Sequence, residues 1–197
     1  TAGWDVRSAS LPVSIATVGG DPIRATSISG VVTLLPCVFA QELVHIVDAD
    51  RDYVAAEMTA FLLFWLGSLA CPLLNRPTSA CLSGPNWRLE QCCLAAAQAG
   101  VRTIDCARNT RGGVVPRTLR ESVTVTLVGD RVIGSADEEV VRGTRLLAAA
   151  ASVDALRATF QRAPDGVRLA GALPFVDAGN AEVRQAIVRY FARGVAA

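Results

Sequence analysis

The chain has 197 residues, of which 51% are hydrophobic and 19% are charged, and its formal net charge is +1. This length is enough for one large or two small domains with a real hydrophobic core. A net charge so close to zero excludes a global electrostatic attraction to nucleic acid or to an anionic membrane, so we expect neither as a partner.

The chain contains no lysine, and all 19 of its basic residues are arginines. A GC-rich genome, which favours arginine codons, would explain this bias. The chemical consequence is the same whatever the cause. The chain can supply no Schiff-base lysine, no P-loop lysine and no lysine that contacts the phosphates of ATP.

Cysteine and histidine usage argues against a metal centre. The only histidine is His45, and no two of the six cysteines form a C-x-x-C pair, so we expect no metal and no cofactor. No signal peptide opens the sequence, which favours a cytoplasmic protein with buried free thiols over a disulfide framework. The cysteines are Cys37, Cys71, Cys81, Cys92, Cys93 and Cys106.

The first part of the chain predicts short extended segments. Residues 4–8 and 12–18 have strand-like patterns, and residues 19–22, Gly-Gly-Asp-Pro, have the composition of a turn. Residues 23–35 hold β-branched side chains and predict one or two further extended segments. Residues 41–47 then predict a short helix that carries His45.

A long apolar helix follows. Asp48 or Asp50 can act as its N-cap, since aspartate is a preferred capping residue there. Its apolar residues recur at spacings of three and four, and others fill the remaining side, so we expect the helix to be covered nearly all round. The uncharged run Met58–Leu74 has 17 residues, but Cys71-Pro72 should end the helix, which favours a core helix over a membrane span.

The next elements predict a buried strand, a loop and a second helix. Leu73-Leu74 is the strand, and Asn75-Arg76-Pro77 is the loop that ends it. The helix spans Trp87–Ala99 and is closed by Gly100. Residues 101–106 are a candidate strand.

An alternation of apolar and polar residues marks the start of the second half of the chain. Ser122–Val128 is the clearest strand, and Gly129-Asp130 suits a type II′ hairpin turn to a partner strand at 131–135. The later elements are expected at 137–151 (helix), 152–162 and 167–175 (strands turned at Pro164-Asp165-Gly166), and a last helix capped by Asn180 with Val183, Ile187 and Phe191 on its inner face.

This order of elements predicts an α/β fold with an open, partly parallel sheet in the first half and a small α+β arrangement in the second. The expected N-terminal α/β domain spans 1–106. An arginine-rich junction spans 107–120, and the α+β C-terminal domain spans 121–197.

Several motifs point to a family. W-D-V-R lies near the start, the long helix has the acidic lead D-A-D-R-D-Y-V-A-A-E and the run F-L-L-F-W-L, and L-N-R-P and G-P-N-W follow it. The second half contains V-T-L-V-G-D-R-V-I-G-S and D-G-V-R-L-A-G-A-L-P. These segments resemble ATP-grasp ligases of the type that glutamylates ribosomal protein or ligates peptides. The resemblance implies a pre-ATP-grasp-like domain followed by a reduced ATP-grasp-like domain.

The chain departs from that family where the chemistry is done. The resemblance implies a lid subdomain that clamps ATP, yet only 107–120 stands in its place. It implies lysines on the phosphates and Glu-x-Asn magnesium ligands on the last strands, where this chain reads Ala170-Gly171-Ala172-Leu173-Pro174. Asp177 and Asn180 lie nearby, and we interpret them as turn and cap residues. Without metal and clamp, phosphoryl transfer loses its main electrostatic stabilisation.

Candidate binding residues are mostly arginines. Asn75 and Arg76 follow a buried strand, where open α/β folds bind ligands, and an arginine fork suits a carboxylate or phosphate; a structural salt bridge is the alternative. The remaining candidates for ligand or partner binding are Arg7, Arg108, Arg111 and Arg117. Solvated linker charge is the alternative for those of the junction. We expect no catalytic residue.

Two other groups of side chains have simple interpretations. Cys92-Cys93 are expected to be buried small hydrophobes, with a redox or nucleophilic pair as the alternative. The carboxylates around Asp48 and Glu57 are expected to be a solvated, capping helix start.

We therefore expect a degenerate ATP-grasp-like protein that has no ATP-dependent ligase activity of its own. It would act as a binding or partner subunit in peptide or natural-product modification, with an ATP-grasp or biosynthetic protein or a peptide as its partner. One alternative is half of a carboxylate-amine ligase that a second chain completes. Another is a small-molecule enzyme that uses a cysteine in the vestigial cleft. The apolar helix also suggests a homodimer.

Overall fold

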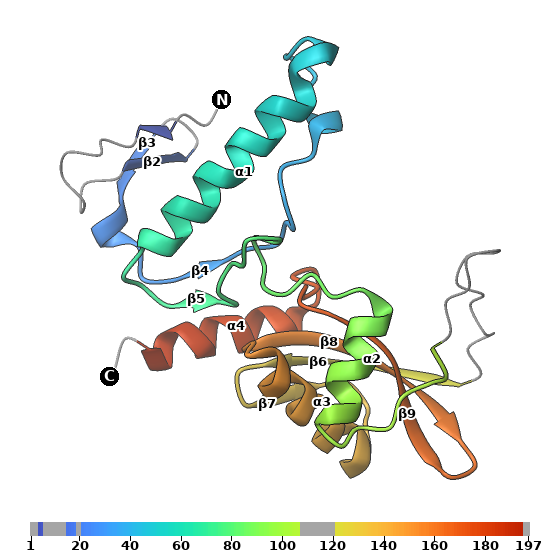
Figure 1. The fold of residues 1–197 in the computed structure, drawn as a ribbon. Coiled ribbons are helices and arrows are strands. Elements are labelled where there is room, and N and C mark those ends of the chain that lie inside the picture. Colours follow the sequence, from blue (N-terminus) through green and yellow to red (C-terminus); the bar gives the residue numbers. More distant parts are fainter. Residues whose placement is uncertain (1–3, 6–14, 19–20, 107–120, 195–197) are drawn as a thin grey trace. The chain divides into compact units, whose positions relative to one another are not determined.

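The computed structural model of the chain describes residues 4–5, 15–18, 21–106 and 121–194. It is a mixed α/β structure with two compact units (Figure 1). One unit holds the described residues up to Gly84 together with those from Phe191 onward, and the other spans Pro85–Tyr190. That residues 1–106 and 121–197 form two separately folding domains stays a prediction.

The first unit begins with an antiparallel sheet in the order β1-β2-β3. Its strands are β1 (Trp4–Asp5), β2 (Ile15–Val18) and β3 (Asp21–Arg24). The predicted turn at residues 19–22 is therefore wrong for Asp21 and Pro22, which open β3. An edge strand can include a proline because the missing N–H has no partner to lose on the open side.

Three short 3-10 helices connect the elements of this unit: η1 (Ala25–Ser27), η2 (Ala40–Glu42) and η3 (Asp48–Asp50). The helix expected at residues 41–47 is wrong, because only η2 forms there and His45 lies exposed in the turn that follows. One 3-10 turn closes through the Leu43 N–H and the Ala40 carbonyl oxygen (3.1 Å) and does not propagate.

The long helix α1 spans Arg51–Ser68. Asp50 occupies its N-cap position but makes no side-chain capping hydrogen bond, so the predicted cap is wrong. Asp50 has φ −104° and ψ −10°, which places it in the helical region and lets α1 continue directly from η3. The Asp48 carboxylate instead forms an ion pair with Arg51 at 2.9 Å.

One face of α1 is buried and the other is exposed. Trp65, Leu66 and Leu69 pack with Leu73 and Leu82 in the core of the first unit. The expectation of a helix covered nearly all round is wrong, since Tyr53 is 68% exposed and Phe64 is 56% exposed. Among the described helices, none has both the length and the hydropathy that crossing a bilayer requires.

A parallel pair completes the first unit. β4 (Val31–Val32) pairs with β5 (Leu73–Leu74), as the predicted partly parallel sheet requires. The buried Ser83 hydroxyl donates toward two carbonyl oxygens, that of Leu35 at 2.8 Å and that of Thr33 at 3.0 Å. This buried hydrogen bonding fixes the segment after β4 to the segment before Gly84.

The second unit is built on a four-stranded antiparallel sheet in the order β7-β6-β8-β9. Ser122–Val128 forms β6, as predicted, and Gly129 has φ +59°, which the first turn position of a type II′ hairpin requires. The other strands are β7 (Arg131–Ile133), β8 (Ala155–Ala163) and β9 (Gly166–Leu173).

Three helices accompany this sheet: α2 (Leu89–Gln98), α3 (Glu138–Ala151) and α4 (Ala181–Gly194). The Asp137 carboxylate caps α3 by accepting from the Val140 N–H at 3.0 Å. The Asn180 side chain accepts from the Glu182 N–H at 2.8 Å, which confirms its predicted role as the cap of α4. Gly100 has φ +78° just after α2, as a residue that closes a helix does.

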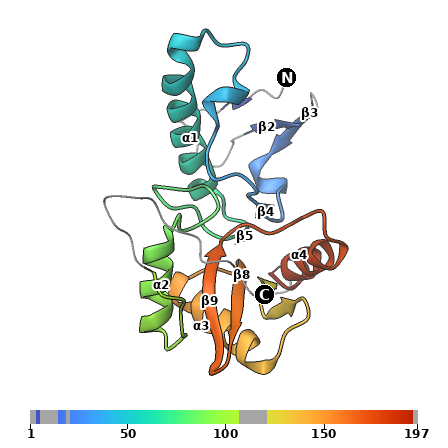
Figure 2. The same ribbon diagram turned by 90° about the vertical axis from the view of Figure 1, so that its right-hand side faces the viewer.

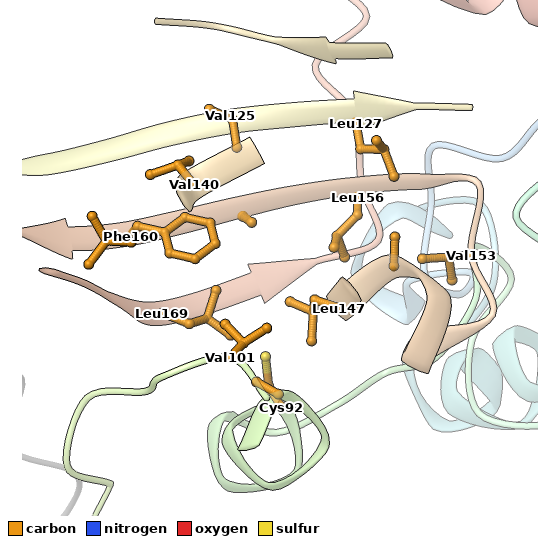
Figure 3. Packing of buried hydrophobic residues seen from close by; sticks show 14 residues of the cluster. Cys92, Val101, Val125, Leu127, Val140, Leu147, Val153, Leu156, Phe160 and Leu169 are labelled. Atoms are coloured by element: carbon orange, nitrogen blue, oxygen red, sulfur yellow. The ribbon is translucent and has the colours of Figure 1, made fainter. Parts of the chain in front are cut away.

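Helices α2 and α3 pack against the sheet and against each other (Figure 2). The strand period of two separates the faces of β8: Leu156, Ala158 and Phe160 are buried, and Arg157 and Thr159 alternate with them. Figure 3 shows Phe160 and Leu156 in one cluster with side chains from β6, β9, α2 and α3. This cluster is the core of the second unit.

The edge strand β9 is irregular. The register shifts between Thr159 and Phe160, which face Gly171 and Leu169, so Ala170 is an extra residue without a partner on β8. On its other side β9 forms a single parallel bridge from Leu169 to Thr103. The strand predicted at residues 101–106 is therefore reduced to this one bridge.

Phe160 is 1% exposed, and its replacement should be costly. We expect Phe160→Ala to lower the free energy of unfolding by about 3–5 kcal/mol, because it leaves a cavity in the core of the second unit. Phe64→Ala, the same change at an exposed site, should cost less than about 1 kcal/mol. Urea titration followed by circular dichroism measures both, and similar costs for the two variants would contradict this packing.

Candidate functional site

The loop after β5 carries the two predicted binding residues that the structure describes. Asn75 is 2% exposed and has φ +64°, a left-handed conformation that asparagine tolerates better than most residues. Arg76 follows it and is exposed. The loop thus lies at the carboxyl end of a parallel pair, as expected from the sequence, and its binding role stays a prediction. Arg7, Arg108, Arg111 and Arg117 lie outside the described residues.

A second site lies on the face of the second unit's sheet opposite Leu156, Ala158 and Phe160, at the end where Thr124 is exposed and Arg157 and Thr159 are half-buried; Thr126, Val128 and Ala155 on the same face are buried. Two cross-strand rows define this open face. In one row Thr124, Thr159 and Gly171 are neighbours on β6, β8 and β9; the two threonine hydroxyls lie 3.1 Å apart. In the next row Arg157 lies between Thr126 and Leu173.

A pocket of about 540 Å³ opens over these rows. Trp87, Leu89 and Cys92 line it from the start of α2 and the residue segment before it. The sheet contributes Thr124, Arg157, Thr159 and the β9 residues Ala170, Gly171, Ala172 and Leu173. One side of the pocket is therefore apolar, and its floor carries two hydroxyls and a cation. We call it the Arg157 pocket.

Arg157 is the chemically distinctive residue of this pocket. It is half-buried, and within the described part of the chain it has no ion pair and no hydrogen-bond acceptor. Its partners across the strands are a threonine and a leucine, so no carboxylate lies beside it in either row. An arginine keeps its charge throughout the physiological pH range and offers a planar set of donors, which suits an anion.

The segment expected to carry magnesium ligands lies at this pocket and does not fit a metal. In the open-face rows this segment contributes Gly171, which has no side chain, and the apolar Leu173. Asp177 instead accepts from the Gly179 N–H at 2.9 Å in a turn, and Asn180 caps α4, as interpreted from the sequence. In the described residues, no three His, Cys, Asp or Glu side chains come together in a way that could hold a metal ion.

Arg157 is not among the binding residues predicted from the sequence. A signal was available, since the alternation A-L-R-A-T-F places Arg157 and Thr159 on the face opposite Leu156, Ala158 and Phe160. The alternation along β8 does not predict the apolar wall of the pocket. Trp87 lies on a different segment, and the packing of α2 beside β9 brings it to the pocket.

A second pocket, of about 470 Å³, lies in the first unit between the segment Cys37–Gln41 and α1. Asp52 is its one charged lining residue. The Thr59 hydroxyl is already used, because it accepts from the Val38 N–H at 3.0 Å and donates to the Ala55 carbonyl oxygen at 2.8 Å. The other polar side chains that line this pocket are those of Gln41 and Ser79, and none of its lining residues is a cation.

All six cysteines are free thiols, and one of them lines the Arg157 pocket. Burial raises the pKa of that residue, Cys92. Burial, followed by the charges of the Cys106 and Cys92 thiols, raises the pKa of Cys93 to about 12. A thiol with a raised pKa is a poor nucleophile near neutrality, since the thiolate is the reactive form. These pKa shifts favour the interpretation of both residues as buried small hydrophobes.

The native chain should therefore alkylate slowly at Cys92 and Cys93. Both folded-state pKa values lie above that of a free thiol, so the thiolate fraction at pH 8 is smaller in the folded chain than in the unfolded one. We expect iodoacetamide at pH 8 to modify the two residues at least about tenfold faster in urea, as measured by mass spectrometry of their shared tryptic peptide. Rapid modification of Cys93 in the native chain would instead support a cysteine enzyme.

Known structures resemble the whole chain, although no protein-family model and no curated protein sequence matches it. The macrocyclase MdnC from Microcystis aeruginosa MRC, bound with precursor peptide MdnA, is 12% identical with a TM-score of 0.73, and the match covers 98% of this chain and 87% of that one. The ATP-grasp ligase PsnB, complexed with minimal precursor, Mg and ADP, is 12% identical with a TM-score of 0.67, covering 98% and 86%.

A third similar structure is a RiPP-associated ATP-grasp ligase from Chryseobacterium gregarium in complex with ADP and a leader and core peptide. It is 9% identical with a TM-score of 0.68, and the match covers 98% of this chain and 84% of that one. Identities this low show the fold and not the activity. The chain therefore has the ATP-grasp-like fold of peptide ligases, which the sequence resemblance implied.

Proposed function

We propose that the chain binds a peptide and does not itself transfer a phosphoryl group. It would serve as a binding or partner subunit in peptide or natural-product modification, without a cofactor and in the cytoplasm. Homodimerisation through the exposed face of α1 is a further part of this proposal. The observation that carries the proposal is the position of Arg157 on the open face of the sheet.

Arg157 lies directly across from Leu173, within the segment where the family resemblance implies magnesium ligands. A magnesium ion about 5 Å from a guanidinium, at an effective dielectric constant of about 20, would be repelled by roughly 7 kcal/mol. The neighbouring open-face positions on β8 and β9, Thr159 and Gly171, offer no carboxylate to offset this repulsion. The charge on this face therefore favours an anion and disfavours a divalent cation.

The sequence also argues against phosphoryl transfer from ATP. The chain has no lysine to contact them, and only residues 107–120 lie between Cys106 and Glu121, where the resemblance implies a lid. Phosphoryl transfer depends on positioning and on neutralising charge that develops on the phosphoryl oxygens. A chain with neither lysine nor metal ligands at this face lacks the groups for that task.

A peptide is the partner best supported by the comparisons. The structure of MdnC contains a precursor peptide, that of PsnB a minimal precursor, and that of the Chryseobacterium gregarium ligase a leader and core peptide. The Arg157 pocket combines an apolar wall with polar groups at its floor, which is the usual composition of a site for a partly apolar ligand.

Isothermal titration calorimetry with Mg-ATP tests the first part of the proposal. We expect no saturable heat with the isolated chain, and no shift in melting temperature on adding Mg-ATP. A ligand at about a hundredfold excess over its dissociation constant would stabilise the folded chain by about 2.7 kcal/mol, which such a melt detects. A complete ATP-grasp ligase serves as the positive control, and clear binding by this chain would refute the non-catalytic assignment.

Selection from a library of random short peptides tests the second part. We expect the immobilised chain to enrich a family of related peptides, and the enriched peptides to raise its melting temperature when they are added free. The heat-denatured chain is the control for adhesion to exposed apolar surface. If the folded chain enriches no peptide family, the peptide-binding function is wrong.

A further inference from the structure

We propose that Cys37 is a site of thiol–disulfide exchange with a low-molecular-weight disulfide, and that Cys81 then completes a reversible Cys37–Cys81 disulfide in the first unit. The small disulfide would enter the pocket between the segment Cys37–Gln41 and α1, which we call the Cys37 pocket. This proposal goes beyond the proposed function, because it concerns a different unit and does not depend on peptide binding.

Two hydrogen bonds align the segment after β4 with the segment before Gly84. The Leu82 N–H donates to the Pro36 carbonyl oxygen at 2.8 Å, and the Ser83 hydroxyl donates to that of Leu35 at 2.8 Å. The two segments therefore run in opposite directions, since the later residue of one lies beside the earlier residue of the other. The residue after Pro36 and the residue before Leu82 are the next neighbours in this alignment.

These two residues are Cys37 and Cys81, which residues 38–80 separate along the sequence. Facing residues of antiparallel segments have Cα atoms about 4.5–5.5 Å apart, and a disulfide spans about 4.4–6.8 Å. Burial raises the pKa of Cys81, and the charge of the nearby Cys37 thiol raises it further. The aligned backbone and the interaction of the two thiols both indicate that a disulfide can form with little backbone movement.

The two cysteines differ in their access to a reagent. Cys37 is half-buried and lines a pocket of about 470 Å³, a volume that admits a small molecule. Cys81 is 1% exposed, so a reagent in solution does not reach it in the folded chain. Its sulfur accepts a hydrogen bond from the Ser83 N–H at 3.4 Å, which favours the thiolate. Cys37 therefore reacts first, and Cys81 is the resolving thiol.

The exchange has two steps, and each step forms one S–S bond and breaks one. In the first, the Cys37 thiolate attacks a sulfur atom of the small disulfide, which forms a mixed disulfide and releases one small thiolate. In the second, the Cys81 thiolate attacks the Cys37 sulfur and displaces the other small thiolate. The two cysteines lose two electrons, the small disulfide gains them, and the two thiol protons pass to the released thiolates. An excess of the small thiol reverses both steps.

The bond would change both the stability of the first unit and the Cys37 pocket. It closes a loop that contains all of α1, and closing a long loop restricts the unfolded chain. It also takes up the thiol that lines the pocket. Disulfides in reducing compartments are usually transient or redox-sensing, and a reversible bond at this position would make the pocket respond to the redox state of its surroundings.

Peptide mapping of the full chain treated with oxidised glutathione tests the proposal. The chain has no lysine, so trypsin cuts after arginine, except before proline. Fragment 25–51 then carries Cys37 as its only cysteine, and fragment 52–88 carries Cys71 and Cys81. Thiols that remain after the treatment are blocked with N-ethylmaleimide before digestion, and mass spectrometry identifies the linked fragments. Cys71→Ser is the matched control, because Cys71 is another half-buried cysteine of the first unit.

We expect the native wild-type chain and Cys71→Ser to give the linked pair of fragments 25–51 and 52–88. Cys81→Ser should instead keep glutathione on Cys37, at a level at least about tenfold above that of the wild type, because the resolving thiol is removed. Cys37→Ser should leave Cys81 reduced. Oxidation should raise the melting temperature of the wild type by about 5–10 °C and that of Cys37→Ser not at all.

The proposal is overturned if the native wild-type chain forms no link between these fragments, or links them through Cys71. It is also overturned if the linked fragments come from different chains, which non-reducing electrophoresis shows, or if Cys81 takes up glutathione in Cys37→Ser. The wild-type and Cys71→Ser maps decide the outcome even if Cys81→Ser fails to fold. None of these outcomes bears on peptide binding by the Arg157 pocket, which the library selection tests separately.

Discussion

The pairing of β8 with β6 on one side and β9 on the other determines both faces of the second unit. The alternation along β8 places Leu156, Ala158 and Phe160 under α2 and α3, and this buried cluster fixes the strand in its register. The same register leaves Arg157 and Thr159 on the other face. The core and the candidate site are therefore two results of a single pattern, and a slip of one residue would destroy both.

The local chemistry of the sequence predicted much of this unit. The S-V-T-V-T-L-V alternation and the glycine of the following turn give β6 and its hairpin, and Asn180 caps α4 as its side chain allows. Most of the errors lie in the first unit, where short segments carry weak patterns, and one lies in the second unit, where the strand expected at residues 101–106 is a single bridge. Residues 41–47 have helical composition but form a single 3-10 turn, and α1 continues from η3 without a side-chain cap at Asp50. Such boundaries depend on tertiary contacts that local patterns do not contain.

The candidate site could also be predicted only in part, because local patterns do not contain tertiary contacts. Asn75 and Arg76 could be found because they follow a recognisable buried strand. Arg157 could be assigned to a face from the sequence, but its lack of an acidic partner is a property of the folded neighbourhood, as is the approach of Trp87. The arginines predicted from the sequence were Arg7, Arg76 and three residues of the polar junction, Arg108, Arg111 and Arg117. In the structure, Arg157 lines a pocket without an acidic partner in the described residues, and it lies outside that junction.

The extra residue Ala170 has a consequence for how this surface can change over generations. Side chains of a regular strand alternate, so one residue inserted without a bulge would exchange the two faces for everything beyond it. Here the bulge accommodates the extra residue, so Ala172 faces the core and Leu173 lies beside Arg157. Losing that single codon would remove the bulge but keep Ala172 toward the core and Leu173 beside Arg157, because Gly171 would then follow Leu169 directly and still lie opposite Thr159. The bulge is thus a position where the edge strand can lose a residue without exchanging its faces, whereas a one-residue shift in the regular strand β8 would exchange both of them.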